Sequence, residues 1–175
     1  MIRPIREFGA YASILGFFGV CVSEVETLLR RARDAASPAE VQIFDADRIA
    51  GWRHLFFALV NALKAFESGR RISSGLPVEC LIYASGQGQI NRAIEMLGVR
   101  GSSSNLAVLI IGADEGVVKE ATAKVSGVIQ GLRDDRILEI QSEEKYYDLC
   151  SLFGITREEV ETVMAKTRED ARVLA

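Results

Sequence analysis

The sequence predicts a single α/β domain over residues 1–175, in which a small mixed β-sheet is wrapped by several helices. The length of 175 residues suits one domain, because a second domain would leave both cores thin. Hydrophobic residues make up 49% and charged residues 26%, as in ordinary globular proteins. Segments typical of strands alternate along the chain with segments typical of helices, which favours a layered α/β or α+β fold.

The first forty residues predict two strands and a helix. Residues 2–22 are rich in Ile, Phe, Tyr and Val, so we expect two short strands around a turn at Ser13–Gly16. Ser23 is expected to cap a helix with glutamates in its first turn and arginines in its last, an order that suits the helix dipole. Pro38 follows that helix, and residues 41–44 indicate a short strand.

The longest helix is expected over residues 47–68, with Asp45 or Asp47 as its cap. One face has large apolar residues at alternating steps of three and four, which predicts a core stripe: Ile49, Trp52, Phe56, Leu59, Leu63 and Phe66. A second face has small residues beside His54, where another backbone or a ligand could approach closely: Ala50, Gly51, Ala58, Ala62 and Ala65.

The rest of the chain continues the alternation. Val78–Ala84 is a continuous apolar run, and its periodicity fits a strand or a buried helix equally. Ser85–Gly88 is expected to open a helix that ends at Gly98. The later elements are expected to be a buried strand at 106–111, a helix at 115–130, a strand at 137–140, and two short helices at 143–153 and 156–166. Thr156 and Glu159 predict a capping box for the last helix.

Ser85–Arg92 is the most informative local pattern. Glycines at a helix start leave backbone N–H groups uncovered, and such an end attracts phosphate or carboxylate. Gln87, Gln89 and Arg92 add side-chain donors for phosphates or base edges. The alternative is a plain serine cap with glycines that permit a turn. No Gly-Lys-Ser/Thr follows, so the pattern is not a Walker loop.

His54 is the only histidine, and no nucleophile motif accompanies it, which favours a structural histidine over a catalytic one. One histidine also argues against a zinc site, and no cofactor is expected. Lys64, Arg70 and Arg71 lie at or beyond one helix end. They are interpreted either as a solvated terminus that favours cations or as contacts for RNA phosphates.

The last two helices have more apolar residues than a short helix pair hides easily. Core packing is the default interpretation, and a partner-docking surface is the alternative. The residues assigned to partner binding are Tyr146, Leu149, Phe153, Val160 and Met164. The apolar stretch Phe8–Ser23 is too short to span a bilayer, so we expect a cytoplasmic protein that does not enter membranes.

Several motifs occur in a specific order: Asp45-Ala-Asp47, then Gly51-x-x-His54-Leu55, then Tyr83-Ala-Ser-Gly-x-x-Gln-Ile90. Together with Leu152-Phe-Gly-Ile-Thr-Arg-Glu-Glu-Val160, this order resembles the small tRNA-tail-binding regulatory subunit of the KEOPS complex, in its archaeal form. The resemblance runs from about Val41 to Val160.

The resemblance implies a partner and a task. The partner is the kinase-like ATPase subunit of KEOPS, contacted largely through helices near the C-terminus. The task is to hold the single-stranded 3′ CCA tail of tRNA while another subunit makes threonylcarbamoyl-adenosine, so this chain would be no enzyme and would take no small-molecule substrate. Such a tail needs a few hydrogen bonds, stacking surfaces and local phosphate contacts rather than a strongly basic protein.

The implied RNA-binding residues are Ser85, Gly86, Gln89 and Ile90 from the Ser-Gly-x-x-Gln-Ile motif, and His54 from the Gly-x-x-His-Leu motif. Charge and position add Lys64, Arg71 and Arg92. The family commonly has an arginine just before the Gln-Ile pair, and this chain has Gly88. Together with the net charge of −3, Gly88 favours an alternative in which the protein docks on the kinase-like partner without touching RNA. A small enzyme with Gly86–Gly88 as a phosphate loop is a third hypothesis.

Overall fold

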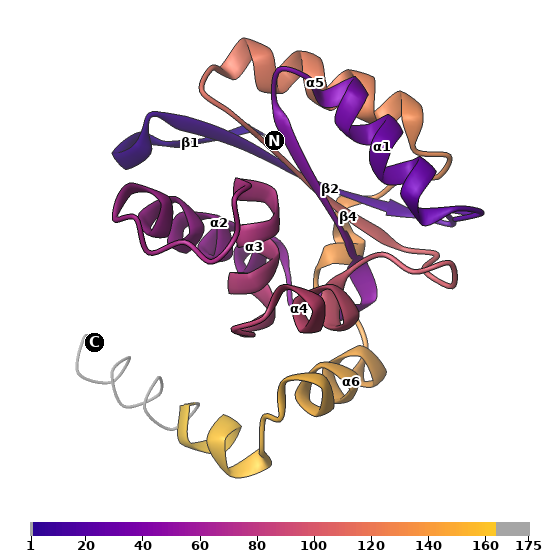
Figure 1. Cartoon of the computed structure of the whole chain (residues 1–175). Helices are drawn as coiled ribbons and strands as arrows, with labels where there is room; N and C mark the ends of the chain where they lie inside the picture. The colour runs from indigo at the N-terminus through magenta and orange to yellow at the C-terminus, as the bar shows by residue number, and fades with distance from the viewer. Residues whose placement is uncertain (1, 164–175) are drawn as a thin grey trace, which may run out of the picture.

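The computed structural model describes residues 2–163 and places one β-sheet at the centre of the molecule (Figure 1). The strands β1 (Ile2–Ile5), β2 (Ala10–Phe18), β4 (Leu106–Gly112) and β3 (Glu40–Asp45) lie in that order, and β5 (Leu132–Arg133) pairs with the end of β2. The predicted α/β class is confirmed. The sheet is not mixed, however, because every described strand pair is antiparallel.

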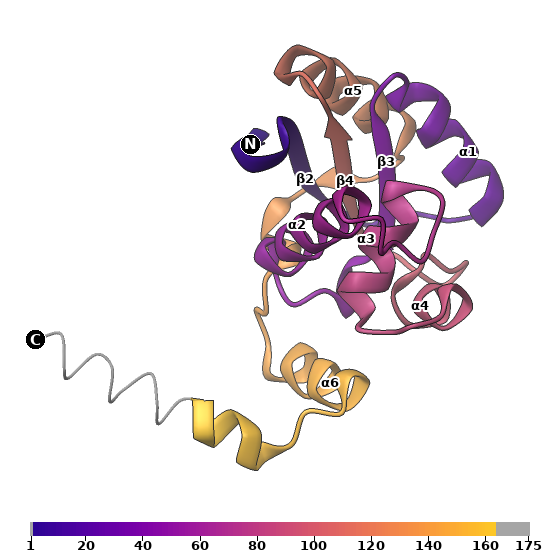
Figure 2. The same cartoon turned by 60° about the vertical axis from the view of Figure 1, so that its left-hand side comes forward.

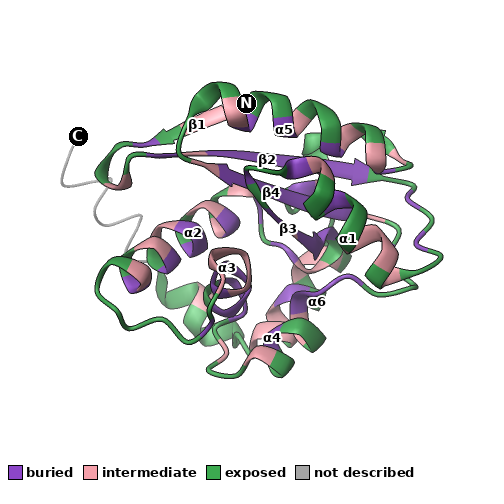
Figure 3. Cartoon of the chain, turned by 45° about the horizontal axis from the view of Figure 1, so that its top comes forward, coloured by how far each residue is buried: buried purple, intermediate pink, exposed green. Residues whose placement is uncertain are grey.

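Helices cover both faces of the sheet (Figures 1 and 3). The helices α1 (Val25–Ala36) and α5 (Glu115–Val128) lie on one face, while α2 (Trp52–Glu67), α3 (Leu76–Ser85) and α4 (Ile90–Leu97) lie on the other. The predicted buried strand β4 separates two cores: alternate residues Leu106, Val108 and Ile110 pack on the α1–α5 side, and the residues between them pack on the α2–α3 side. Both faces of β4 are therefore buried, which explains its continuous apolar sequence.

The first two strands turn at a different place from the one predicted. The chain reverses through a 3₁₀ turn at Arg6–Phe8 and Gly9, whose φ is +58°. Ser13 and Gly16 lie within β2, where Ser13 pairs with both Ile2 and Ile110. Gly16 is needed for packing rather than for a turn, because a Cβ there would lie 2.6 Å from the carbonyl oxygen of Asp134. The helix α1 likewise begins at Val25, with Glu24 rather than Ser23 at its cap position.

The long helix begins later than predicted, and its face with small residues is buried more deeply than the predicted core stripe. Asp45 accepts a hydrogen bond from the Asp47 N–H in a short 3₁₀ turn, Ala46–Arg48, and α2 starts only after Gly51. The buried face of α2 is the one with small residues: Leu55, Ala58, Leu59, Ala62 and Ala65. These residues pack against α3, so the element that lies close to the small-residue face is a neighbouring helix and not a ligand. In the predicted stripe Ile49 and Leu59 are buried, and the other large residues are half-buried. Three of these, Trp52, Phe56 and Leu63, pack against the same core.

The run Val78–Ala84 is a helix, and Ser85–Gly88 follows its end. Pro77 lies in the first turn of α3, and Gly86 ends the helix in the left-handed conformation at φ +65°. The predicted helix start is therefore a helix end, and α4 begins only at Ile90. The alternative of a strand is wrong because α3 lies between α2 and α4, where all but one residue from Glu79 to Ser85 is buried.

The last third contains a 3₁₀ turn at Asp135–Leu138 in place of the predicted strand at 137–140. The helix α6 (Glu143–Phe153) follows, and residues 157–163 are helical. The capping box is confirmed: the Thr156 N–H donates to Glu159 at 2.8 Å, and the Glu159 N–H donates to the Thr156 hydroxyl at 3.3 Å. Met164 lies outside the described residues. Within residues 2–163, no helix is both long and apolar enough to cross a bilayer.

Candidate functional site

The turn between α3 and α4, together with the first turn of α4, holds five of the eight predicted RNA-binding residues. Ser85 is 2% exposed, and its hydroxyl donates to the Ile82 carbonyl oxygen at 2.9 Å and accepts from the Gln87 N–H at 3.2 Å. Ser85 therefore shapes the turn from inside. Gly86, Gln89 and Arg92 are exposed, and Ile90 is half-buried. Tyr83, in the last turn of α3, is also exposed and is the aromatic residue nearest to this turn in the sequence.

Gly88 lies at an open position in this turn. A Cβ built on Gly88 meets no atom within 4 Å, and its φ is not positive. Gln89 stands at the cap position of α4 without a side-chain cap bond, so that helix start is not closed by its own cap residue. The turn therefore has room for a longer side chain at position 88.

His54 ties three helices together. The Ala50 N–H donates to Nδ1 at 3.2 Å, so the proton is on Nε2, which donates to the carbonyl oxygen of Ala84 at 2.7 Å. The ring meets Phe153 of α6 edge-on, with centroids 5.5 Å apart. Burial lowers the pKa of His54, although the bond to Ala84 opposes that shift. Because both ring nitrogens are bonded within the chain, His54 acts as a structural histidine at the edge of the α3–α4 turn.

Lys64 and Arg71 do not join this cluster. Lys64 follows His54 by ten residues in α2, which corresponds to about 15 Å along the helix axis. Arg71 lies beyond the same far end and stacks over the ring of Phe66 at 4.8 Å from its centroid. The predicted RNA-binding residues therefore form two groups, at opposite ends of α2.

The helix α6 is held to the body by a small number of side chains. Lys145 donates to the carbonyl oxygens of Ile137 at 2.7 Å and Leu138 at 3.2 Å. Burial lowers the pKa of Lys145, against the opposing effect of Asp47 and other nearby carboxylates. Leu149 is only 4% exposed, and Phe153 packs on His54. Figures 1 and 2 show α6 at the end of the molecule where α4 lies, outside the sheet and its covering layers.

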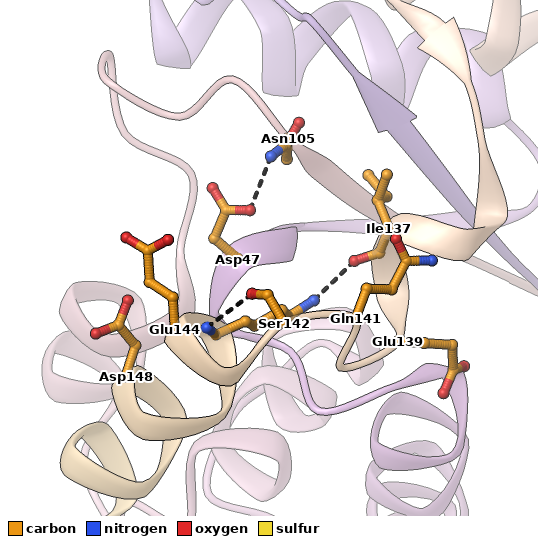
Figure 4. Close-up of a pocket in the computed structure, with 9 residues that line it drawn as sticks. Asp47, Asn105, Ile137, Glu139, Gln141, Ser142, Glu144 and Asp148 are labelled. Atoms are coloured by element: carbon orange, nitrogen blue, oxygen red, sulfur yellow. Dashed lines mark hydrogen bonds between the residues drawn. The ribbon is translucent and has the colours of Figure 1, made fainter.

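A polar pocket of about 410 Å³ lies where α6 meets the body (Figure 4). Its lining includes four carboxylates, and its one cation, Lys145, is engaged by backbone carbonyl oxygens. Carboxylates repel phosphate, so the pocket does not suit the RNA backbone. The lining residues are Asp47, Asn105, Ile137, Glu139, Gln141, Ser142, Glu144, Lys145 and Asp148.

The predicted partner-binding residues differ in how far their side chains are buried. Leu149 is buried, and the half-buried Phe153 packs on His54, so both residues attach α6 to the body. Tyr146 and Val160 are half-buried. The exposed aromatic residue of α6 is Tyr147, at 65% exposure, which packs edge-on against Tyr146 with centroids 5.4 Å apart. The sequence pattern missed Tyr147 because the orientation of α6 decides which of two adjacent tyrosines faces outward.

A second surface feature also escaped the sequence pattern. The Arg3 guanidinium lies 3.7 Å from the centroid of the Trp52 ring, and that of Arg53 lies 5.0 Å from it. The partner of Trp52 comes from β1, far away in the sequence, so no local signal indicates this contact. Among residues 2–163, no group of three or more His, Cys, Asp or Glu is arranged to hold a metal ion.

The fold and these contacts define an α/β protein whose candidate site is a surface made of helix ends and an outlying helix. The model of the family described as kinase binding protein CGI-121 matches residues 21–171. The chain belongs to that family, and the resemblance indicated by the ordered motifs is thereby confirmed. The regulatory protein Cgi121 of Methanocaldococcus jannaschii is 32% identical over 104 residues, which cover 59% of this chain and 63% of that protein.

Proposed function

We propose that this protein is a non-catalytic cytoplasmic subunit of the KEOPS complex that recruits tRNA and binds the kinase-like ATPase subunit. In this role it holds the 3′ CCA tail of tRNA at the α3–α4 turn, while another subunit makes threonylcarbamoyl-adenosine. The α6 region docks on the kinase-like partner. The family's description as a kinase binding protein supports the partner, and the motif order supports the complex.

The observation that carries the RNA-binding part is the exposed group beside the α3–α4 turn. Tyr83 offers a ring on which a base can stack, and Gln89 and Arg92 offer donors to base edges and phosphates. Arg92 forms no ion pair among the described residues, so its charge is available to an anion. Gly86, Ile90 and the buried Ser85 set the shape of this surface, and His54 fixes it to α6.

Lys64 and Arg71 belong to the proposal as a separate contact. Both are exposed at the far end of α2, where a phosphate more distant from the tail would meet them. Phosphate contacts of this kind position an RNA without reading its sequence. Substituting Lys64 or Arg71 is therefore expected to lower the affinity for intact tRNA and for tRNA without its CCA end by the same factor.

The proposal is tested by fluorescence anisotropy with labelled tRNA, intact or lacking its CCA end, at one fixed salt concentration. Intact tRNA should bind more tightly. Arg92→Glu should weaken its binding about tenfold, because a phosphate contact is replaced by a repulsion. Arg30→Glu, the same change on α1 at the opposite face of the sheet, is the matched control and should have little effect.

Gly88 allows a gain-of-function variant. Because its Cβ position is open, Gly88→Arg should fold normally and raise the affinity for intact tRNA by restoring the cation that the family commonly has there. Equal binding of intact and tailless tRNA by both the natural protein and Gly88→Arg would contradict tail recognition. A docking-only subunit, which Gly88 and the net charge of −3 favour, would then be the better function.

A further inference from the structure

The outward face of α2 combines basic side chains with an aromatic ring. The exposed residues within this helix are Arg53, Phe57, Asn61, Lys64 and Glu67. The first four follow one another at steps of four, four and three residues, so they lie on one face of the helix, and we call them the α2 stripe. From its first to its last residue the stripe spans about 16 Å along the helix axis, a length that roughly five stacked nucleotides cover.

The cations of the stripe have no counter-charge within the described part of the chain. Neither Arg53 nor Lys64 forms an ion pair there. The Arg53 guanidinium lies 5.0 Å from the centroid of the Trp52 ring, and that of Arg3 lies 3.7 Å from the same centroid. The carboxylate at this helix start, Glu139, accepts from the Trp52 N–H at 3.2 Å and pairs with neither guanidinium. Positive charge is therefore concentrated at the start of the stripe, although the net charge of the chain is −3.

Phe57 places a ring between these cations, one turn after Arg53 and two turns before Lys64. Its side chain is 61% exposed, and its ring meets that of Phe56 edge-on, with centroids 6.1 Å apart. A base can stack on so open a ring. Asn61, one turn further along, has no side-chain hydrogen bond within the described part of the chain, so its amide is available to a base edge or a phosphate.

The helices on the opposite face of the sheet have a different surface. In α5 exposed acids and bases alternate, and Lys124 pairs with Glu120 at 2.7 Å. In α1 the exposed arginines are accompanied by the exposed Glu26 and Asp34. No large apolar side chain is exposed on either helix. The stripe differs from these mixed surfaces, and cations interleaved with an aromatic ring are typical of surfaces that bind single-stranded nucleic acid.

We propose that the α2 stripe binds single-stranded RNA along its length, with a base stacked on Phe57 and phosphates at Arg53 and Lys64. This inference rests on the proposed function and extends it. The His54 bond to Ala84 holds the start of α2 beside the α3–α4 turn, so a strand whose end lies in that turn can continue along the stripe. The stripe thereby connects the two groups of RNA-binding residues. Stacking and phosphate contacts tolerate any sequence, so the turn provides the preference for a CCA end.

The test uses the full chain and two fluorescein-labelled RNA strands of equal length, UUUUUCCA and UUUUUUUU, in anisotropy titrations at one fixed salt concentration. Phe57→Ala removes the ring and should weaken the binding of both strands by the same factor, about tenfold. Phe57→Tyr keeps a ring and should bind both strands normally. Tyr147→Ala is the matched control, because Tyr147 is an aromatic residue of α6 that is 65% exposed, and it should also bind normally.

The phosphate contacts have a separate measurement. Arg53→Gln and Lys64→Gln should each reduce the slope of log affinity against log salt concentration by about 0.7, the value for one phosphate of a single strand. A peptide of eight glutamates competes for the cations but has no ring to stack on Phe57. It should therefore displace the labelled strands far less effectively than unlabelled RNA does.

The outcomes separate this inference from the proposed function. Unchanged binding of both strands by Phe57→Ala, or no binding of either strand, would overturn the stripe, while intact and tailless tRNA would still decide tail recognition. Equal affinity for the two strands, together with a loss in Phe57→Ala, would support the stripe and contradict tail recognition. Displacement by the glutamate peptide as effective as that by unlabelled RNA would show a surface for anions in general and overturn the stacking of a base.

Discussion

The α3–α4 turn and the helix α6 are attached to the molecule in different ways. The helix α3 is surrounded by α2, α4 and the sheet, and its residues belong to one of the two main cores. The helix α6 lies outside those layers and is held through Lys145, Leu149 and Phe153. We therefore expect α3 to unfold only with the body and α6 to open locally.

The difference teaches how to interpret motif residues on each surface. Each surface has a buried residue that holds its segment to the body, and a nearby exposed residue that is available to a ligand or partner. These are Ser85 and Gln89 in the turn, and Leu149 and Tyr147 in α6. Substituting the buried residue should lower the free energy of unfolding, of the whole body for the turn and of the helix alone for α6. Substituting the exposed residue should change only the affinity for the ligand or partner.

The largest expected effect concerns the body. Glu79 is fully buried in α3, and its carboxylate accepts from the Ile72 N–H at 3.1 Å and the Ser73 N–H at 2.7 Å. Glu79→Ala leaves these donors without their charged acceptor and should lower the free energy of unfolding by about 3 kcal/mol. Urea unfolding measures this, with the exposed Glu67→Ala as control. A loss for Glu79→Ala no greater than that of the control would contradict the anchoring role.

The next effect should stay local to α6. Leu149→Ala removes a buried side chain and should cost roughly 2–3 kcal/mol in the stability of this helix. Amide hydrogen exchange should speed up in residues 143–153 and remain slow in α3. Faster exchange in both helices would show that α6 and the body unfold together, and the contrast between them would be wrong.

Tyr147→Ala should leave stability unchanged and weaken binding of the kinase-like subunit about tenfold, as expected for an exposed aromatic residue at an interface. Isothermal titration calorimetry with that subunit from the same source measures the change. Phe57→Ala is the control, because Phe57 is 61% exposed and belongs to α2 rather than to α6. If the two variants bind equally, α6 is not the docking surface.

The smallest effect is a pH dependence of the contact between α6 and the body. Because burial holds the pKa of His54 below its usual value, the unfolded chain binds the proton more readily than the folded chain. The stability from neutral His54 is fully present above the usual histidine pKa of about 6.5 and is lost as pH falls through the lower folded value. His54→Phe should flatten this slope in pH-dependent unfolding. If an NMR titration of the His54 ring protons gave a midpoint above the usual histidine pKa, this predicted pH dependence would be contradicted.

Much of the fold could be predicted from local patterns. The strand β4 and the capping box of Thr156 and Glu159 depend on neighbouring residues alone, and both are confirmed. The core stripe of α2 is confirmed in part, because most of its large residues belong to or pack against the core. Its face with small residues is buried more deeply, because α3 packs on it. The helix α3 did have a signal: Pro77 at its start and Gly86 at its end follow the usual asymmetry of helix termini.

The candidate site was less predictable, because exposure depends on tertiary packing. The motif residues do gather near one turn, yet the sequence does not distinguish the buried Ser85 from the exposed Gln89. Lys64 and Arg71 share charge with Arg92 but lie at the far end of α2. The sequence predicts the helix to which a residue belongs. Whether its side chain faces the core or the solvent depends on how that helix packs.

Crossed binding measurements test most directly whether the α3–α4 turn and α6 are two independent docking surfaces. Arg92→Glu and Tyr147→Ala are each titrated against intact tRNA and against the kinase-like subunit. We expect Arg92→Glu to weaken tRNA binding and spare the kinase-like subunit, and Tyr147→Ala to do the reverse. If each variant lowers both affinities, or neither, the division of the molecule into an RNA surface and a partner surface is wrong.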